Sequence, residues 1–138
     1  MKVFVDTNVL LDVLSRREPF HQDAIQIWSL AEAGKLKGLV SAISVANVFY
    51  LVRRFKNARA AYEAVRLIRD TFGIVACDER VLCQAMDAGW KDFEDAVQYF
   101  SARHAQAACI VSRDGDHFTK SDLPVLSPAE FLAGFLMT

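Results

Sequence analysis

The chain has 138 residues, of which 53% are hydrophobic and 24% are charged, and its formal net charge is −1. This length and apolar content suit one globular domain spanning residues 1–138, and they exclude a disordered chain. The near-neutral charge also excludes a protein coated with basic residues for nucleic-acid binding. Any contact with nucleic acid must therefore come from a local patch.

The three cysteines, Cys77, Cys83 and Cys109, are odd in number and form no CxxC pair. A secreted domain held together by disulfides is therefore not expected, and a reducing cytoplasm is the expected location. The longest uncharged stretch, residues 38–52, is shorter than the roughly 20 residues that a membrane-spanning helix needs. We expect a soluble cytoplasmic protein without a membrane association.

In chain order, short apolar runs typical of strands alternate with longer segments whose apolar residues recur at helical spacing. The expected strands are 2–6, 38–41, 73–76, 108–112 and 124–126. The expected helices are 9–14, 21–34, 45–55, 58–72, 79–89, 92–107 and a last one that starts at 127–128. This alternation predicts an α/β fold in which helices cover both faces of a mostly parallel sheet of four or five strands.

Local signals set the expected ends and faces of these helices. Thr7 or Asn8 is expected to cap the first helix, and Ser44 precedes the third. The buried face of the fourth helix is expected to contain residues at helical spacing, namely Tyr62, Val65 and Ile68.

Three aspartates fall where parallel strands are expected to end or where a helix starts. Asp6 ends the first strand, Asp114 follows the strand 108–112, and Asp95 lies in the first turn of the helix 92–107. Because sites in open parallel sheets form beyond the carboxyl ends of the strands, we expect these carboxylates to converge. Each one alone has a plainer interpretation, since Asp6 could cap a helix, Asp95 could favour the helix dipole and Asp114 could belong to a turn.

Three converging carboxylates repel one another unless protons or cations neutralise them. Mg²⁺ prefers a few carboxylate ligands and keeps waters for a phosphate substrate, and two such ions can activate water for attack on a phosphodiester. The sequence therefore predicts a divalent-cation site formed by Asp6, Asp95 and Asp114. Asp92 lies three residues before Asp95, on the same helix face, and Asp116 follows two residues after Asp114.

Four other titratable residues are given no part in this site. Glu94 is expected to point into solvent, and Asp12 is expected on the helix surface or behind the site. His104 and His117 are lone histidines and are assigned no catalytic role.

The segments around these acids resemble those of the PIN-domain nucleases, particularly the small bacterial members related to the VapC toxins. The resemblance covers the segments 5–12, 41–47, 92–99, 110–118 and 126–132, and their order and spacing make it specific. It implies a three-layer α/β/α fold with a parallel sheet. It also implies cleavage of single-stranded RNA that depends on Mg²⁺ or Mn²⁺.

The resemblance also implies roles for individual residues. The first, third and fourth acids of the family correspond to Asp6, Asp95 and Asp114, and Asp116 matches a further acid that is often present. Thr7 and Asn8 match positions that shape the turn after the first strand. Family members commonly form homodimers, and toxin members are held inactive by an antitoxin protein, so the resemblance implies both kinds of partner.

Asn47 departs from the family pattern, because many members have a glutamate at this position and a subgroup has asparagine. The amide keeps a carbonyl oxygen but removes one negative charge, so metal affinity should fall or the ion should depend more on Asp92, Asp116 and water. An RNA- or protein-binding module with weak catalysis is therefore the alternative function. A phosphatase with an aspartyl-phosphate intermediate is disfavoured, because Asn8 stands where that chemistry wants a second acid.

Basic residues near the predicted site are candidates for binding RNA phosphates. They are Arg53, Arg54 and Lys56, within a cluster of basic residues that also includes Arg59, Arg66 and Arg69, and Arg113 beside Asp114. A solvated pair of helices explains the cluster at 53–69 equally well.

Overall fold

The computed structural model describes residues 1–137 of the chain. Within these residues the strands are β1 (Lys2–Val5), β2 (Lys37–Ser41), β3 (Gly73–Val75), β4 (Cys109–Val111) and β5 (Val125–Leu126). The helices are α1 (Thr7–Leu14), α2 (His21–Glu32), α3 (Ala42–Phe55), α4 (Ala58–Thr71), α5 (Glu79–Asp87), α6 (Phe93–His104) and α7 (Pro128–Leu136), with a 3₁₀ turn η1 (Gly115–His117). No helix in this part of the chain is both long and apolar enough to span a bilayer.

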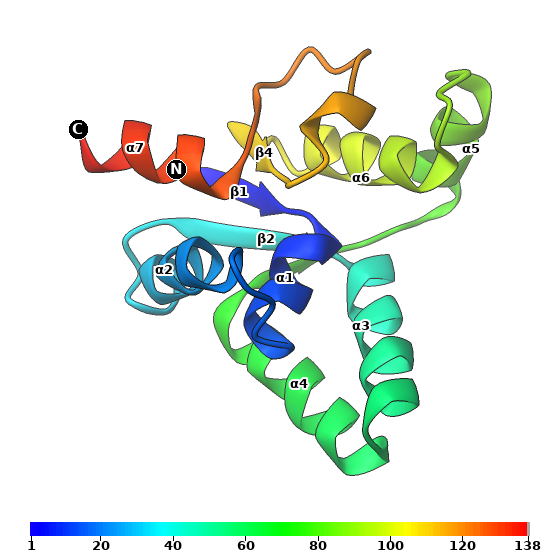
Figure 1. Ribbon diagram of the computed structural model, residues 1–138. Helices are drawn as coiled ribbons and strands as arrows, with labels where there is room; N and C mark the ends of the chain where they lie inside the picture. Colours follow the sequence, from blue (N-terminus) through cyan, green and yellow to red (C-terminus); the bar gives the residue numbers. More distant parts are fainter. Residues whose placement is uncertain (138) are drawn as a thin grey trace.

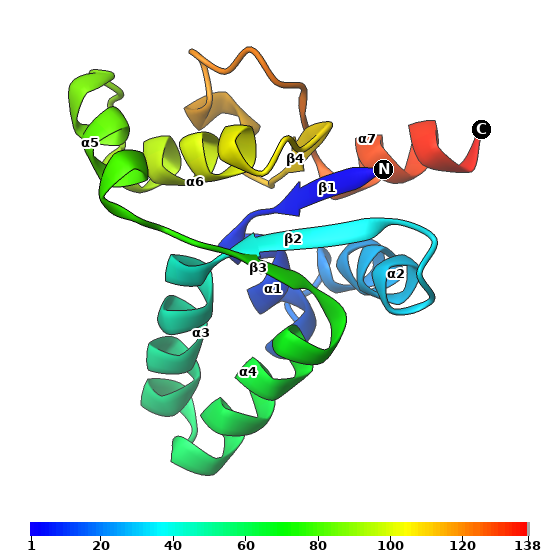
Figure 2. The same ribbon diagram turned by 180° about the vertical axis from the view of Figure 1, so that it is seen from behind.

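The five strands form one parallel sheet in the order β3-β2-β1-β4-β5. Figure 1 shows α5 and α6 on one side of this sheet and α1 to α4 on the other, and Figure 2 shows the same layers from behind. The hairpin of α3 and α4 extends away from the sheet in both views. The predicted three-layer α/β/α architecture with a parallel sheet is therefore confirmed.

Each central strand buries both of its faces, as expected for a covered parallel sheet. Val3 and Val5 point into the core shared with α1, α2 and α7, whereas Phe4 points into a second core beneath α6. Phe4 stands level with Leu39 of β2 and Ile110 of β4 across the sheet. The continuous apolar runs in the sequence thus supply the two cores that hold the layers together.

The strand order places a topological switch point between β1 and β4. The chain builds outward from β1 through β2 to β3 on one side, and β4 and β5 lie on the other side. The carboxyl ends of β1 and β4 meet here, and the backbone N–H of Asp6 donates to the carbonyl of Val111 at 3.0 Å. In open α/β sheets, ligands bind in the crevice outside the carboxyl ends of the strands at a switch point. The residues that follow β1 and β4 are therefore the candidates for a functional site.

The first and third helices begin earlier than the sequence predicted. Asp6, not Thr7 or Asn8, is the N-cap of α1, and its side chain accepts from the backbone N–H of Thr7. Ser41, not Ser44, caps α3 by accepting from the N–H of Ile43 at 3.2 Å. In both cases the strand passes into the helix without a loop, and the cap is the polar residue at the junction, Asp6 directly after β1 and Ser41 at the end of β2.

The buried face of α4 also differs from the prediction. Ala61, Ala64 and Ile68 face the core, while Tyr62 is 52% exposed and packs its ring edge-on against Phe49 at 4.8 Å between centroids. The small side chains of Ala61 and Ala64 fit between α4 and the core, whereas the larger ring of Tyr62 lies at the edge of the packed face.

Candidate active site

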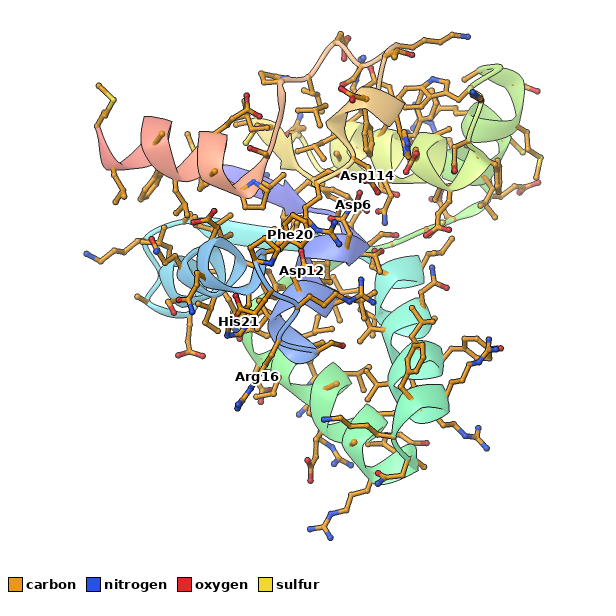
Figure 3. The ribbon with its side chains drawn as sticks, viewed as in Figure 1. Asp6, Asp12, Arg16, Phe20, His21 and Asp114 are labelled. Atoms are coloured by element: carbon orange, nitrogen blue, oxygen red, sulfur yellow. The ribbon has the colours of Figure 1, made fainter. Side chains whose placement is uncertain are left out.

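An open cavity of about 420 Å³ lies beyond the carboxyl ends of β1 and β4. Five of the residues that line it are acids, namely Asp6, Asp92, Glu94, Asp95 and Asp114. They come from the end of β1, the start of α6 and the loop after β4, and Figure 3 shows Asp6 and Asp114 near each other at this edge of the sheet. The structure thus brings together the three aspartates that the sequence selected.

Asp6 is 6% exposed and is held by hydrogen bonds to both carboxylate oxygens. Oδ1 accepts from the N–H of Thr7 at 2.7 Å and from Gln98 Nε2 at 3.3 Å, and Oδ2 accepts from Ser112 Oγ at 2.7 Å. Burial raises the pKa of Asp6 and the charge of Asp114 adds to that rise, although the hydrogen bonds from Ser112 and Thr7 oppose it. The carboxylate is fixed in orientation, but within residues 1–137 no cationic side chain forms an ion pair with it.

Asp95 is 9% exposed, and its backbone N–H donates to Asp92 Oδ1 at 3.1 Å, so Asp92 is the N-cap of α6. Asp95 Oδ2 is buried without a hydrogen bond, although His117 Nδ1 lies 3.2 Å away. Burial raises the pKa of Asp95 to about 6, the charges of Asp92 and Asp6 add to the rise, and His117 opposes it. Negative charge on this buried carboxylate is therefore unfavourable in the absence of a cation.

Asp114 is exposed and is oriented by Asn8 of α1 and by Ser112, which directly follows β4. Its Oδ2 accepts from Asn8 Nδ2 at 3.2 Å, and its backbone N–H donates to Ser112 Oγ at 3.0 Å. Ser112 Oγ in turn donates to Asp6. Asp6 and Asp114 are thus linked through one serine hydroxyl.

Glu94 is exposed to solvent as the sequence predicted, but it also lines the acidic cavity, which the sequence analysis did not expect. Its Oε1 accepts from Asn47 Nδ2 at 3.3 Å, which joins α6 to α3 across the cavity. His117 also lines the cavity, beside Asp95. Three acids within residues 92–95 could have indicated that Glu94 belongs to the site. No pattern in the sequence indicated the same for His117.

Gln98 is a further residue that the sequence analysis missed. It is 1% exposed on α6, and its Nε2 lies 3.1 Å from Thr7 Oγ1 and 2.8 Å from Ser44 Oγ as well as near Asp6. The two hydroxyls of Thr7 and Ser44 are themselves 2.7 Å apart. This buried polar network joins α6, α1 and α3 directly behind Asp6, and the one signal for it was a glutamine within a buried helical stretch.

Asp116 does not line the acidic cavity. It lines a neighbouring cavity with Lys91, and this second cavity shares Asp92 and His117 with the first. Asn47 and the cap residue Asp92, predicted as accessories, both line the acidic cavity, as do Thr7 and Asn8.

The basic residues predicted to bind phosphate lie outside the acidic cavity. Arg113 donates from Nε to Asp12 Oδ2 at 2.5 Å and from an Nη to Asp12 Oδ1 at 3.2 Å, so its guanidinium is engaged elsewhere. The remaining three are exposed at the C-terminal end of α3, where cations favour the helix dipole, and they are Arg53, Arg54 and Lys56.

The acidic cavity fits a hard divalent cation by the chemistry of its donors. Among residues 1–137 no group of three or more His, Cys, Asp or Glu side chains stands ready to enclose a metal ion. The donors that face the cavity are nevertheless mostly carboxylate oxygens, and Oδ2 of Asp95 is buried with no hydrogen bond. Burial, together with the neighbouring carboxylates, raises the pKa of Asp6 and Asp95, and a bound cation would favour the ionised form of both.

Comparison with known proteins places the chain in a family and shows which folds it resembles. The chain is 28% identical over 134 residues to Ribonuclease VapC1 of Aquifex aeolicus, covering 94% of this chain and 92% of the relative. Its fold is similar to a toxin–antitoxin complex from Klebsiella pneumoniae, with a TM-score of 0.67, 21% identity and coverage of 91% and 97% of the two chains. It is also similar to the Mycobacterium tuberculosis toxin VapC20, with a TM-score of 0.66, 19% identity and coverage of 83% and 92%. The family model of the PIN domain matches residues 2–116, and the chain therefore belongs to the PIN domain family.

Proposed function

We propose that this protein is a metal-dependent endoribonuclease in which Asp6, Asp95 and Asp114 hold Mg²⁺ or Mn²⁺. The observation that carries the proposal is the meeting of these carboxylates, from three distant parts of the chain, in one open cavity. When bound there, the cation would activate water and stabilise the leaving oxygen of a phosphodiester.

The choice of RNA as substrate is supported by the relatives. The Aquifex relative is named a ribonuclease, and the tuberculosis toxin is described as cleaving the sarcin–ricin loop. We extend cleavage of RNA to this chain, but not the particular target of either relative.

The surrounding residues have roles that follow from their contacts. The N–H of Thr7 and the hydroxyl of Ser112 fix the carboxylate of Asp6. Asn8 orients Asp114, and His117 offers a partner for the buried oxygen of Asp95. These groups would hold the ligands in place before the substrate arrives, which is the main contribution that a protein makes to such a site.

Glu94 offers an explanation for Asn47. The position on α3 contributes an amide, and that amide donates to a carboxylate supplied by α6. We propose that Glu94 provides the negative charge that Asn47 lacks, so that an asparagine at position 47 is compatible with metal binding.

The test is cleavage of single-stranded RNA by the purified protein with and without Mn²⁺. We expect the wild type to cleave and a chelator to stop it, whereas Asp6→Asn should abolish cleavage while circular dichroism stays unchanged. Asp70→Asn, on the exposed surface of α4, is the matched control and should cleave normally. Full cleavage by Asp6→Asn in the presence of Mn²⁺ would overturn the assignment.

Asn47 favours one alternative, a catalytically weak RNA- or protein-binding module on the same scaffold. Such a module needs no cation, so calorimetric titration with Mn²⁺ separates the two functions. Stoichiometric uptake that Asp6→Asn abolishes supports the nuclease, and no uptake by the wild type supports the binding module.

We also propose that the protein is the toxin of a toxin–antitoxin pair and that it forms a homodimer. Solved relatives include the Klebsiella toxin–antitoxin complex and VapBC-1 of Haemophilus influenzae. On this chain the α3–α4 hairpin leaves large apolar side chains more than half exposed, as interaction surfaces do, and these are Tyr50, Phe55, Tyr62 and Leu67.

Expression in a bacterial host tests the toxin proposal. Wild-type protein should arrest growth, Asp6→Asn should not, and co-expression of the product of an adjacent small reading frame should relieve the arrest. Light scattering of the purified chain tests the dimer, and a monomeric mass at micromolar concentration would contradict it.

A further inference from the structure

We infer that the ion pair between Asp12 and Arg113 is a positioning device that fixes Asp114, and that Arg113 does not bind the substrate. The inference rests on the proposed function only insofar as Asp114 is a metal ligand. It assigns Asp12 and Arg113, both outside the acidic cavity, to the support of the site.

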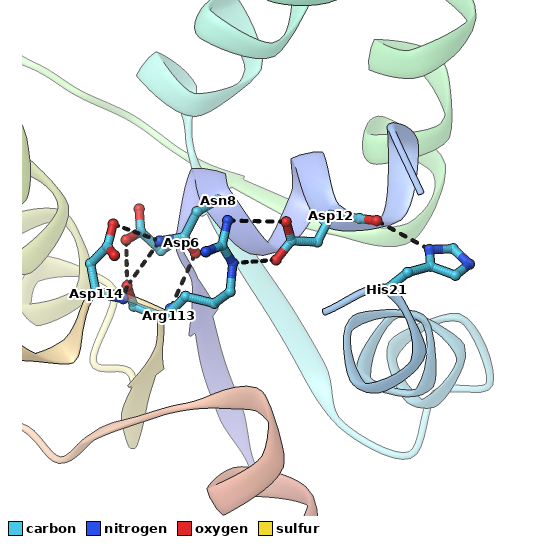
Figure 4. Close-up of polar contacts among 7 residues, drawn as sticks. Asp6, Asn8, Asp12, His21, Arg113 and Asp114 are labelled. Carbon is cyan, nitrogen blue, oxygen red and sulfur yellow. Dashed lines mark hydrogen bonds and ion pairs between the residues drawn. The ribbon is translucent and has the colours of Figure 1, made fainter. Parts of the chain in front are cut away.

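The pair has the geometry of a two-point bond. Both oxygens of Asp12 accept from the guanidinium of Arg113, from Nε at 2.5 Å and from an Nη at 3.2 Å. The side chain of Asp12 is fully buried, and that of Arg113 is 22% exposed. Such bidentate pairs fix direction as well as distance, and Figure 4 shows both contacts.

The pair is held from two further sides. The guanidinium of Arg113 lies 4.0 Å from the centre of the Phe20 ring, where a cation is attracted to the aromatic face. The backbone carbonyl of Asp12 accepts from His21 Nδ1 at 3.1 Å. If Arg113 swung out to a phosphate, it would leave the buried carboxylate of Asp12 without a partner, which is strongly unfavourable.

Two side chains of α1 form hydrogen bonds and an ion pair with the loop after β4. Asn8 and Asp12 are four residues apart and therefore share one face of α1. Asn8 Oδ1 accepts from the backbone N–H of Arg113 at 3.3 Å, Asn8 Nδ2 donates to Asp114, and Asp12 binds the side chain of Arg113. The segment 112–114 is thus attached to α1 through both its backbone and its side chains.

The N-cap of the same helix is Asp6. One rigid element, α1, therefore sets the position of Asp6 at its start and the position of Asp114 through Asn8 and the ion pair. Metal ligands from different segments must be held in a fixed relative position. Mutation of the residues that orient such ligands typically lowers metal affinity by about 10- to 100-fold.

The first experiment is calorimetric titration of Mn²⁺ into the full chain without RNA. Asp12→Asn and Arg113→Met should each weaken Mn²⁺ binding by about 10-fold or more. The double variant should be no weaker than either single one, because the two residues act as one unit. Arg113→Lys keeps the positive charge but cannot make the two-point contact of a guanidinium, so its Mn²⁺ affinity should lie between those of Arg113→Met and the wild type. Leu132 in α7 is buried in the core and does not line the acidic cavity, so Leu132→Ala should lower stability without altering Mn²⁺ affinity.

RNA cleavage separates the positioning role from phosphate binding. If Arg113 contacted RNA, Arg113→Met would raise KM, while Asp12→Asn would leave both KM and Mn²⁺ affinity as in the wild type. That result would overturn the inference. The expected result is a lower kcat for both variants at a given Mn²⁺ concentration, restored in part by excess Mn²⁺.

Amide hydrogen exchange in the presence of a chelator makes the test independent of the metal. The N–H of Asp114 donates to Ser112 Oγ, and its exchange should become at least several-fold faster in Asp12→Asn but not in Leu132→Ala. Unchanged exchange in Asp12→Asn would overturn the positioning role even if the protein is a nuclease. Failure of the wild type to take up Mn²⁺ would refute the proposed function instead, while the exchange result still decides whether the pair fixes the loop.

Discussion

Replacing Asp95 with asparagine should stabilise the metal-free protein at neutral pH, although it removes a proposed metal ligand. The pKa of Asp95 rises from the ordinary 3.8 to about 6, mainly because the carboxyl is buried and also because Asp92 and Asp6 are charged. Each pKa unit corresponds to about 1.4 kcal/mol, so keeping Asp95 ionised in the fold costs about 3 kcal/mol at most. Asparagine has nearly the same shape and no charge, and we expect a gain of about 1–3 kcal/mol in the free energy of unfolding at pH 7.

The same pKa gives the sign of the pH dependence. Because the fold favours the protonated carboxyl, the stabilising effect of protonation is complete below about pH 4 and is lost as pH rises through about 6. Asp6, whose pKa is also raised, contributes in the same direction. The difference in free energy of unfolding between Asp95→Asn and the wild type should therefore grow as pH rises from 4 to 7.

Urea denaturation from pH 4 to 7.5, in chelator and then in Mn²⁺, measures this difference. In chelator Asp95→Asn should be the more stable protein at neutral pH. In Mn²⁺ the wild type should gain stability, because a cation that binds the folded protein and not the unfolded chain stabilises the fold. The variant should gain little, because it lacks one of the proposed metal ligands. If the two proteins are equally stable in chelator at every pH, the carboxylate does not bear the cost that the geometry indicates.

Two other substitutions test how the site and the core are held. Gln98→Leu should lower the free energy of unfolding by about 1–3 kcal/mol in urea denaturation, because buried hydroxyl and carboxylate groups lose their donor. Since Gln98 Oε1 is buried without a hydrogen bond, a neutral effect would mean that Gln98 gives no net stabilisation. Gly38→Ala would place a Cβ 2.5 Å from a Phe72 ring carbon and should cost about 1–3 kcal/mol, whereas Gly134→Ala in α7 meets no atom within 4 Å and should gain about 0.5–1 kcal/mol. Thermal unfolding of the glycine pair should show melting temperatures that move in opposite directions, and a shift in the same direction would contradict the packing argument.

The sequence predicted the sheet well because its signals are local. Each strand is a short apolar run, and most helices have a capping side chain of their own, such as Asp78 before α5 and Ser127 before α7. Parallel strands separated by helices leave few choices of topology, and in each choice the carboxyl ends of the strands share one edge. The meeting of Asp6 with Asp114 therefore followed from the alternation of elements.

The partners of these acids were not predictable in the same way. Arg113 was a candidate for binding phosphate because it stands next to Asp114, but its side chain instead reaches Asp12, 101 positions earlier in the sequence. Periodicity says which face of a helix is buried and nothing about which side chain from another element meets it. Gln98 and His117 were missed for the same reason, because their roles depend on contacts with other elements.

Asn47 and Glu94 are best understood as a pair, and the pair yields a last prediction. Asn47 donates to Glu94 across the cavity, whereas a glutamate at position 47 would face a second carboxylate at the same place. Asn47→Glu should therefore lower the midpoint of urea denaturation in chelator, because like charges repel, and should strengthen Mn²⁺ binding in calorimetry, because another anionic ligand is available.

Two variants serve as controls for this prediction. Asn47→Gln keeps the amide and should change the denaturation midpoint little. Combining Asn47→Glu with Glu94→Gln should restore the midpoint in chelator, since it exchanges the positions of the amide and the carboxylate. If Asn47→Glu is as stable as the wild type in chelator, the two side chains do not face each other in solution. The proposal that Glu94 supplies the negative charge that Asn47 lacks would then be refuted, because it depends on the contact between these two side chains across the cavity.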